Sequence, residues 1–291
     1  MKITSLPDVE PRPRRVAVGM FDGVHLGHQA VIEGADTVLT FDPHPTTVLA
    51  PATAPKLLTT VKRKAELLSR LGVQELVVVP FDAEFAARTA ERFVDEVLVG
   101  ALGATHVSVG ENFRFGQRAQ GTPALLQADD RFETRVVPLL ERDGEIVSSS
   151  HIRGLILGGA VEYADQLLGA PFLVEGEVQH GEKRGRELGF PTANLVPPPG
   201  MVVPAFGVYA CRANGQPSAV SVGVRPTFAT GLGELIEAFL IDFSGDLYGQ
   251  TLRVEFLRRL RGERRFDSAE ALIEQMHQDV EDARTVVAAA G

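Results

Sequence analysis

The feature that most constrains the fold is a change in how apolar residues are spaced along the chain. In the first half, short apolar runs alternate with segments that carry one apolar stripe at helical spacing. After Ala170-Pro171, apolar runs follow one another directly, and a helical pattern returns only at the end. Alternating strands and helices are typical of a parallel sheet, whereas consecutive strands are typical of an antiparallel one. The sequence therefore predicts an α/β domain over residues 1–168 and a small antiparallel barrel or sandwich with a C-terminal helix over residues 169–291.

The first domain offers three loops that are expected to lie at one edge of its sheet. Strands are expected at Val16–Gly19, Val38–Phe41, Glu75–Val79, His106–Val109 and Arg135–Leu140, with helices at Val61–Leu71 and Ala90–Leu102. Ligands of parallel sheets bind outside the carboxyl ends of the strands. Residues 19–28, 42–45 and 110–116 each follow an expected strand, so these three segments are candidates for one binding site.

The segment from Gly19 to His28 carries the densest set of candidate functional residues. It reads Gly-Met-Phe-Asp-Gly-Val-His-Leu-Gly-His and joins an expected strand to an expected helix. Its glycines allow a sharp turn and a close approach of the backbone to a ligand. Two histidines three residues apart share a helix face, and the N–H groups of a helix start favour an anion. The pattern favours a nucleotide phosphate site over an ordinary strand-to-helix turn. Its candidate residues are Gly19, Phe21, Asp22, Gly23, His25, Gly27 and His28.

Three further segments of the first domain carry candidate residues. In Asp42-Pro43-His44-Pro45, the prolines restrict the backbone around the histidine, which either orients its imidazole or makes a rigid surface turn. A second loop, with Asn112, Phe113 and Phe115, is suited to stack a flat ring or to anchor itself in the core. The third segment offers hydroxyls and a cation where a helix begins, which fits a phosphate clamp or a serine-rich helix cap. Its residues are Ser149, Ser150 and Arg153.

The second domain is expected to consist of consecutive strands closed by one helix. The strands are expected at Phe172–Val178, Val208–Ala213, Ala219–Val224, Leu235–Phe243 and Thr251–Leu257. In the last of them, Leu252, Val254 and Phe256 should point to one side of the sheet and the charged residues between them to the other. The helix is expected to begin at an N-cap Asp267, with Glu270 three residues later.

A glycine-bearing segment of the second domain suggests a second phosphate site. Residues 189–194 read Gly-Phe-Pro-Thr-Ala-Asn and follow a basic loop that contains Gly181 and Gly185. Glycines let backbone N–H groups face phosphates, and a threonine hydroxyl beside an asparagine carbonyl offers hard oxygen ligands for Mg²⁺. By itself such a segment is also compatible with a simple turn. The candidate residues are Gly181, Gly185, Gly189, Pro191, Thr192 and Asn194, with Thr192 and Asn194 as metal ligands.

Glu237 is the candidate general base of the second domain. Period-2 alternation puts it on the same strand face as Phe239, Ile241 and Phe243. A carboxylate in line with an apolar face is either a strand-end residue that reaches solvent or a partly desolvated base with a raised pKa. The pattern leaves these two interpretations open.

Composition argues against several classes of protein. The 291 residues suffice for two domains, and a formal net charge of −9 argues against a nucleic-acid surface. No apolar run approaches the ~20 residues that span a bilayer, and residues 1–15 lack the apolar segment of a signal peptide. Cys211 is the single cysteine, which permits no disulfide within the chain and no cysteine-based zinc site. A reducing cytoplasm is therefore the expected compartment.

These motifs carry a resemblance to a known family. Phe-Asp-Gly-x-His-x-Gly-His, at residues 21–28, resembles the adenylyl-transfer signature of the bacterial bifunctional riboflavin kinase/FMN adenylyltransferases, the prokaryotic FAD synthetases. The segments around His44, Phe113 and Arg153 resemble further segments of that family in the same order. Residues 189–194 match the family's riboflavin kinase signature without a change, and a glutamate resembling Glu237 precedes its next motif.

The resemblance implies a Rossmann-like nucleotidyltransferase domain, a riboflavin kinase-like barrel and two reactions. The barrel would phosphorylate riboflavin to FMN with ATP and Mg²⁺, with Glu237 as base. The first domain would adenylate FMN to FAD and release pyrophosphate, with His25, His28 and Arg153 as catalytic residues. ATP would lie against residues 19–28 and 149–153, and FMN against residues 42–45 and 112–115.

One departure from the family pattern bears on the first reaction. Only residues 29–37 separate the histidines from the next strand, so the intervening helix should be one or two turns long. A riboflavin kinase with an impaired adenylyltransferase domain is therefore one alternative. A flavin- or nucleotide-binding regulator without turnover is another. A cytidylyltransferase of the same superfamily would explain the first motif but leave residues 189–194 and Glu237 unexplained.

Overall fold

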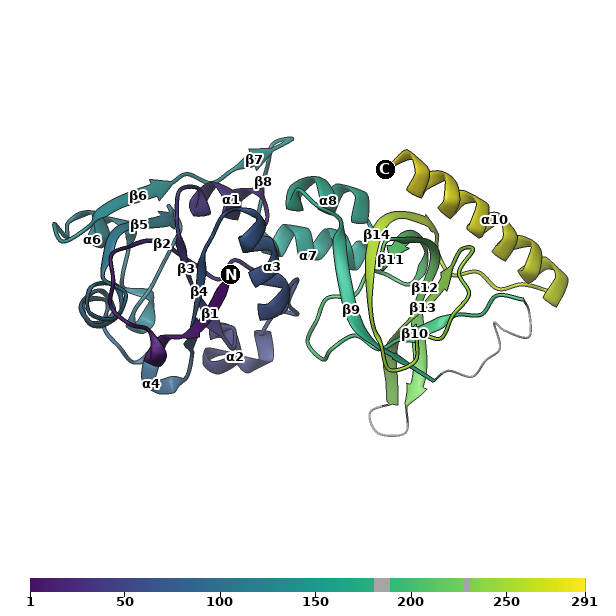
Figure 1. The fold of residues 1–291 in the computed structure, drawn as a ribbon, viewed down its shortest axis with the longest axis horizontal. Coiled ribbons are helices and arrows are strands. Elements are labelled where there is room, and N and C mark those ends of the chain that lie inside the picture. Colours follow the sequence, from purple (N-terminus) through teal and green to yellow (C-terminus); the bar gives the residue numbers. More distant parts are fainter. Residues whose placement is uncertain (181–188, 228–230, 291) are drawn as a thin grey trace. The chain divides into compact units, whose positions relative to one another are not determined.

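The computed structural model describes residues 1–180, 189–227 and 231–290. By their internal contacts they divide into two compact units, Met1–Ser149 and Ser150–Gly291 (Figure 1). The helices α7 (Ser149–Gly158) and α8 (Val161–Leu168) fall almost wholly in the second unit, where α8 packs on two strands of the barrel. The domain boundary at residue 168 stays a prediction.

The first unit is built on a six-stranded sheet in which every strand pairing is parallel. In spatial order the strands are β1 (Lys2–Ser5), β4 (Glu75–Pro80), β3 (Thr37–Asp42), β2 (Arg14–Val18), β5 (Ala104–Gly110) and β6 (Glu133–Val137). From β2 the chain first builds outward through β3 and β4, and it later returns to the other side of β2 with β5. The strand order therefore reverses between β2 and β5, and such a switch point is where ligands of these sheets bind.

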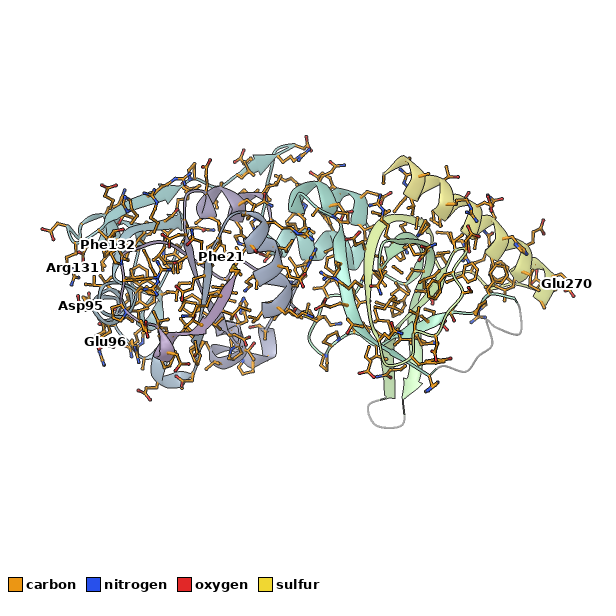
Figure 2. The ribbon with its side chains drawn as sticks, viewed as in Figure 1. Phe21, Asp95, Glu96, Arg131, Phe132 and Glu270 are labelled. Atoms are coloured by element: carbon orange, nitrogen blue, oxygen red, sulfur yellow. The ribbon has the colours of Figure 1, made fainter. Side chains whose placement is uncertain are left out.

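Helices and turns cover both faces of this sheet, as expected. Alternate residues of β2 enter two separate cores: Val16 and Val18 pack with the π-helical segment η3, and Ala17 packs with α1 and α3. Phe21 is buried in the second of these cores (Figure 2). The helical segments are η1 (Leu6–Asp8), α1 (Leu26–Ile32), α2 (Pro45–Leu49), η2 (Pro51–Thr53), α3 (Val61–Arg70), α4 (Ala83–Ala86), α5 (Ala90–Arg92), η3 (Phe93–Ala101), η4 (Gln117–Ala119) and α6 (Pro123–Gln127).

Two details of the first sheet differ from the expectation. Strand β1 was not predicted, because Lys-Ile-Thr-Ser has no apolar run; it forms along β4, where the Thr4 hydroxyl donates to Glu75 (2.9 Å). Strand β6 ends at Val137 rather than Leu140, because proline follows and cannot donate to a ladder. A short hairpin, β7 (Glu141–Arg142) with β8 (Glu145–Ile146), lies beyond it.

The second unit contains a closed antiparallel barrel, which decides between the barrel and the sandwich. Leu252, Val254 and Phe256 are fully buried inside it, as the alternation predicts. Around the barrel the strands are β10 (Ala193–Leu195), β13 (Gly231–Leu240), β12 (Gln216–Thr227), β11 (Gly207–Ala213), β14 (Thr251–Arg261) and β9 (Phe172–Gln179), which pairs again with β10. The single cysteine, Cys211, is buried in β11.

Helix α10 (Ala269–Ala289) packs along the outside of the barrel, against β11, β12 and β14 (Figure 1). Its N-cap is Ser268, whose hydroxyl accepts from the Ala271 N–H (3.2 Å), so the expected N-cap Asp267 was wrong by one residue. The strand expected to reach Phe243 ends at Leu240, because the chain turns at Asp242, where φ is 58°. Ile241 instead joins Ala283 in the layer between the helix and the barrel.

Candidate functional site

The first candidate site is the turn of residues 19–28 between β2 and α1, called the histidine turn below. Asp22 is 3% exposed, and its carboxylate accepts from the backbone N–H groups of Leu58 and Thr59, each at 3.0 Å. The Thr59 hydroxyl donates to the same carboxylate (3.2 Å) and accepts from the Gly23 N–H (3.1 Å). Asp22 is therefore the anchor that ties the histidine turn to the segment before α3.

The histidine turn is held in a conformation that its residues rarely adopt. Phe21 and Val24 have φ angles of 49° and 47°, in the left-handed region where a β-branched residue is an outlier. Such positions cost about 1–3 kcal/mol each and persist only where the surroundings over-determine them. Here both side chains are buried in the same core as α1. Strain held at a ligand-binding edge of the sheet is typical of a functional turn.

His25 and His28 form a stacked pair at the start of α1. Their ring centroids are 3.5 Å apart at an interplanar angle of 20°. The Nδ1 of His25 accepts from the backbone N–H of His28 (3.2 Å), so its neutral ring carries the proton on Nε2. Buried Nδ1 of His28 has no hydrogen-bond partner among the described residues. The pair thus offers an imidazole nitrogen that a ligand can satisfy.

Burial keeps both imidazoles neutral in the ligand-free protein. It lowers the pKa of His25 to about 4. Burial also lowers the pKa of His28 well below its ordinary value, and His25 and Lys64 lower it further. An anion bound beside the rings would oppose both effects, because it favours the charged form. A phosphate that bound here would therefore meet both histidines as neutral hydrogen-bonding groups.

The lowered pKa values predict acid sensitivity of the first unit. Between about pH 6.5 and 4 the unfolded histidines bind protons that the folded ones do not, so stability is present above pH 6.5 and is lost as the pH falls. Replacing His25 with asparagine, which can still cap α1, should remove up to about 3 kcal/mol of that loss. Urea unfolding at pH 7, 5.5 and 4 checks this. His106→Asn is the matched control; an equal effect of both variants would contradict the prediction.

The loops after β3 and β5 flank the histidine turn, because β3, β2 and β5 are neighbours in the sheet. His44 caps α2, where its Nδ1 accepts from the Thr46 N–H (3.2 Å), and Asp42 and Pro43 before it are exposed. Phe113 is half-buried and stacks on Phe115 with 5.5 Å between ring centroids. Phe115 itself is 6% exposed and packs on Phe93 of η3. In the loop after β5, Phe113 is therefore the more exposed of the two aromatic rings, and Asn112 beside it is exposed.

Of the serine segment, Ser149 reaches the histidine turn. Its hydroxyl donates to the backbone carbonyl of Asp22 (2.9 Å). Ser150 and Arg153 lie in the first turns of α7 and are counted with the second unit. Arg153 is half-buried there.

The structure adds one residue that the sequence reasoning missed. Lys64 of α3 is 4% exposed and donates to the backbone carbonyl of Met20 (2.5 Å) and to the Thr40 hydroxyl (3.1 Å). A signal for it exists in the sequence, since Lys64 lies within the apolar stripe formed by Ala65 and Leu68 of the same helix. A cation in such a stripe is buried when the stripe faces a core.

The second candidate site lies on the outer face of the barrel, where β10 pairs with β13. Asn194 and Glu237 lie directly opposite each other in the ladder, so their side chains share one face. Their neighbours Ala193, Ile236 and Ala238 point into the barrel and are buried. Asn194 is 7% exposed and Glu237 is half-buried. The expected ligand and the expected base are thus brought together across two strands.

The segment before β10 is anchored by one aromatic ring. Phe190 is buried and packs on Phe239 of β13 (5.3 Å between centroids) and on His277 of α10 (5.0 Å). Gly189 precedes it with φ at 87°, Pro191 is exposed and Thr192 is half-buried. The predicted residues Gly181 and Gly185 lie outside the described residues.

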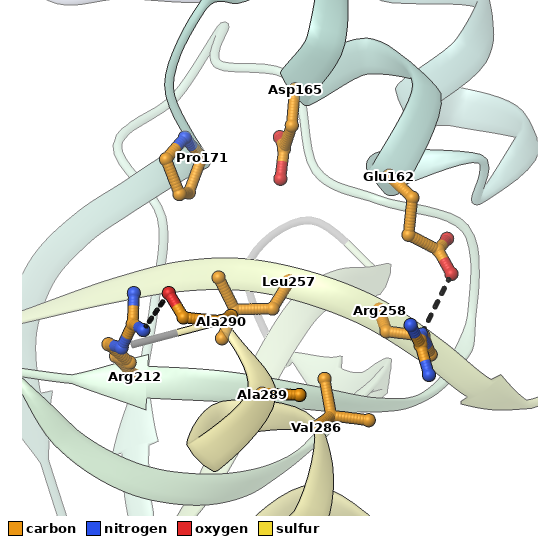
Figure 3. A pocket seen from close by; sticks show the side chains of 9 residues that line it. All are labelled: Glu162, Asp165, Pro171, Arg212, Leu257, Arg258, Val286, Ala289 and Ala290. Atoms are coloured by element: carbon orange, nitrogen blue, oxygen red, sulfur yellow. Dashed lines mark hydrogen bonds and ion pairs between the residues drawn. The ribbon is translucent and has the colours of Figure 1, made fainter.

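A cavity of about 280 Å³ in the second unit is lined by a half-buried acid, Asp165, that neither site uses (Figure 3). Among the residues that line it, Glu162 pairs with Arg258 (3.4 Å) and Arg212 donates to the carbonyl of Ala290 (2.7 Å). Asp165 accepts from the Phe172 N–H at the start of β9 (2.7 Å). Burial raises its pKa to about 8, and Glu162 adds to the shift.

The raised pKa of Asp165 predicts that the folded chain loses stability as the pH rises. Between about pH 4 and 8 the unfolded chain releases this proton and the folded chain keeps it. The stability that the neutral carboxyl of Asp165 contributes is therefore fully present below pH 4 and is lost as the pH rises toward 8. Asp165→Asn keeps the acceptor for Phe172 and should stabilise the chain by about 1–3 kcal/mol at pH 8.5, but not at pH 4. Calorimetry at both values checks this. The exposed Asp267→Asn is the control, and a pH-independent effect of Asp165→Asn would contradict the prediction.

Comparisons with known proteins agree with this arrangement. Family models described as FAD synthetase and as riboflavin kinase match residues 8–151 and 168–287. The bifunctional riboflavin kinase/FMN adenylyltransferase of Listeria monocytogenes is 39% identical, over 94% of this chain and 92% of that protein. The protein of the same name from Escherichia coli K12 is 36% identical, over 92% and 91%. A crystal structure described as a macrolide-efflux protein from Streptococcus pneumoniae matches with a TM-score of 0.89 at 33% identity, over 98% and 99% of the two chains.

Within the described ranges, no helix has the length and apolar character needed to cross a membrane.

The two family models match the chain one after the other, and the relatives match it over nearly their whole length. The expected fold order, a parallel α/β unit followed by an antiparallel barrel with a C-terminal helix, is confirmed. The chain belongs to the family of the bifunctional riboflavin kinase/FMN adenylyltransferases.

Proposed function

We propose that this chain converts riboflavin to FMN in the barrel and FMN to FAD in the first unit, with one ATP consumed in each step. The observation that carries the proposal is the presence, in one chain, of two separately built sites. The histidine turn lies beside the switch point of the parallel sheet, and Asn194 lies opposite Glu237 on the barrel. A reducing cytoplasm is the proposed compartment, supported by the free and buried thiol of Cys211.

In the first unit, the FMN phosphate attacks the α-phosphate of ATP. A new phosphorus–oxygen bond forms, the bond between the α- and β-phosphates breaks, and pyrophosphate leaves. A phosphate monoester has a second pKa near about 6, so it is largely ionised at neutral pH and needs no strong base. What it needs is orientation and stabilisation of the developing charge. The stacked pair His25 and His28 meets that need, because their neutral rings present nitrogens at a rigid turn.

Substrate placement in the first unit follows the same reasoning. We propose that ATP binds Gly19, Gly23 and Gly27 through close backbone approach, with Ser149 on its phosphates. The assignment of Ser150 and Arg153 to the same phosphates stays a prediction from the family resemblance. Asp22 and Phe21 hold the turn rather than the nucleotide, which their burial supports. For FMN we propose a position against His44, its neighbours Asp42 and Pro43, and the half-buried ring of Phe113, with Asn112 beside it. The buried ring of Phe115 stacks on Phe113 and so holds it in place.

In the barrel, the ribityl hydroxyl of riboflavin attacks the γ-phosphate of a second ATP. The hydroxyl is neutral, so a base must take its proton as the oxygen–phosphorus bond forms and ADP leaves. We propose Glu237 for this role, because it is half-buried opposite Asn194 and is the carboxylate of that pair. Gly189, Pro191 and Thr192 would line the ATP phosphates together with Gly181 and Gly185.

Magnesium is proposed as the cofactor of the barrel reaction. The residues present fit it, because the Thr192 hydroxyl and the Asn194 side-chain carbonyl are hard oxygen donors two residues apart in the chain. A bound Mg²⁺ would neutralise charge on the transferred phosphate. Thr192 and Asn194 would hold it, and the near-complete burial of Asn194 supports its being fixed in place for that task.

One time course tests the proposal. The purified chain is incubated with riboflavin, ATP and Mg²⁺, and flavins are separated by chromatography. We expect FMN to appear first and then to give way to FAD. FMN that accumulates even when it is supplied as substrate would favour a riboflavin kinase with an impaired first unit. Flavin binding without any product would favour the non-catalytic regulator.

A further inference from the structure

Lys64 is a buried cation placed between the two loops that are proposed to hold the substrates of adenylyl transfer. Its Nζ lies 2.5 Å from the carbonyl oxygen of Met20, in the histidine turn, and 3.1 Å from the hydroxyl of Thr40, near the end of β3. The Thr40 hydroxyl in turn donates to the Met20 carbonyl (3.0 Å). The three groups close a triangle that joins α3, β3 and the histidine turn.

The charges around Lys64 come from all three of these elements. Asp22 in the histidine turn and Asp42 at the end of β3 both favour its ammonium form. His28 of α1 feels the positive charge of Lys64, which contributes to keeping that imidazole neutral. On its own helix, Arg63 pairs with Glu66 (3.1 Å). The carboxylates of both loops therefore stabilise the positive charge of Lys64.

Burying a lysine is unfavourable unless the charge does something that an apolar residue cannot do. Leu68, one turn further along the same face of α3, is aliphatic and fully buried, so this face packs on apolar surroundings. What the ammonium adds is a hydrogen bond to the Met20 carbonyl and another to the Thr40 hydroxyl, which itself donates to that carbonyl. Together these bonds fix the direction of the Met20 carbonyl. That carbonyl immediately precedes Phe21, whose backbone is held in a left-handed conformation with φ at 49°.

We propose that Lys64 is a positioning residue for adenylyl transfer, whose ammonium holds the Met20 carbonyl and the Thr40 hydroxyl and so locks the histidine turn to the end of β3. The proposal rests on the proposed function of the first unit. It gives Lys64 no contact with substrate: it acts through the turn that carries His25 and His28. Loss of the ammonium would leave the strained turn free to relax and would misplace both rings.

A set of three variants tests the proposal in the full-length chain. Lys64→Met keeps the length and removes the charge, Lys64→Arg keeps the charge, and Lys62→Met is the matched control at an exposed position of the same helix. Lys64→Met should lower kcat for FMN adenylation about 10- to 100-fold with riboflavin phosphorylation within twofold of the unaltered chain. Lys62→Met should leave both reactions within twofold.

The pH profile separates positioning from simple stabilisation. Burial lowers the pKa of Lys64 to about 8, so the unaltered chain should lose adenylation as the pH rises past 8. Lys64→Arg stays charged at these values, so it should retain activity at pH 7.5 and lack this alkaline loss. An unchanged alkaline limb in Lys64→Arg would overturn the proposal. So would normal adenylation by folded Lys64→Met.

Hydrogen exchange keeps the test independent of activity. In Lys64→Met, backbone amides of residues 20–28 should exchange at least about tenfold faster, while those of β4 stay protected. Equal protection of the turn in both proteins would refute the role given to Lys64, whatever the activity. If the unaltered chain makes no FAD from FMN, the proposed function fails, but exchange of the turn still decides whether Lys64 holds it. If Lys64→Met does not fold, the pH profile of Lys64→Arg decides.

Discussion

Replacing Glu237 with glutamine is expected to lower riboflavin phosphorylation by about two to four orders of magnitude, with adenylation of supplied FMN within twofold of normal. The ribityl hydroxyl must lose its proton during attack, and a glutamine cannot accept it. Glutamine keeps the size and hydrogen-bonding capacity of glutamate, so the β10–β13 ladder and the opposing Asn194 should be retained. Separate initial-rate assays with riboflavin and with FMN as substrate measure the two effects.

The matched control is Glu177→Gln, which removes a carboxylate from an exposed position of β9, next to β10 in the barrel. It should leave both reactions unchanged. Full phosphorylation by Glu237→Gln would show that another group is the base. Loss of both reactions in a folded variant would show that the two sites are not independent. Glu237→Asp should phosphorylate riboflavin at a rate between those of the unaltered chain and of Glu237→Gln. The shorter side chain keeps the carboxylate but places it further from the ribityl hydroxyl.

Replacing His28 with alanine is expected to lower FMN adenylation by about two orders of magnitude and to leave riboflavin phosphorylation intact. The variant removes the ring whose buried Nδ1 has no partner among the described residues. It should not unfold the histidine turn, because the cap of α1 uses the backbone N–H of residue 28 and the side chain of His25. The expected loss is therefore one of transition-state stabilisation rather than of structure.

Kinetics with FMN and ATP, followed by release of pyrophosphate, measures this loss. His106→Ala is the control, since that histidine lies elsewhere in the first unit, beside Glu133 (3.2 Å). Both variants should show the same thermal unfolding within a few degrees. Wild-type adenylation by His28→Ala would remove the histidine pair from the mechanism. A rise in KM for ATP at constant kcat would mean that His28 contributes to binding alone.

The helix after the histidines is as short as the sequence predicts. The sequence leaves room for one or two turns, and α1 is seven residues long. Its last residues, Val31 and Ile32, are buried in the core beside Leu68 of α3. The short helix is therefore packed into the core of the first unit, and the time course described above tests whether its length affects adenylation.

The alternation of strands and helices in the first unit, the succession of strands in the second and the motifs of both candidate sites can be read from the amino-acid sequence alone. The physical reason is that hydrophobic periodicity and glycine turns are local properties, and a parallel sheet brings the ends of successive strands to one edge. The three loops after β2, β3 and β5 did fall side by side for that reason. Alternation likewise placed Leu252, Val254 and Phe256 inside the barrel.

The contacts that the polar residues of these motifs make depend instead on the three-dimensional packing of the chain. Asp22 is an anchor because Leu58 and Thr59, 36 and 37 residues further on, present their N–H groups to it. Lys64 is buried because α3 turns its face onto β3 and the histidine turn. Asn194 meets Glu237 because β10, too short to be recognised as a strand, pairs with β13. Burial, strand register and the pKa values that follow from them depend on residues far apart in the chain, and no local pattern contains them.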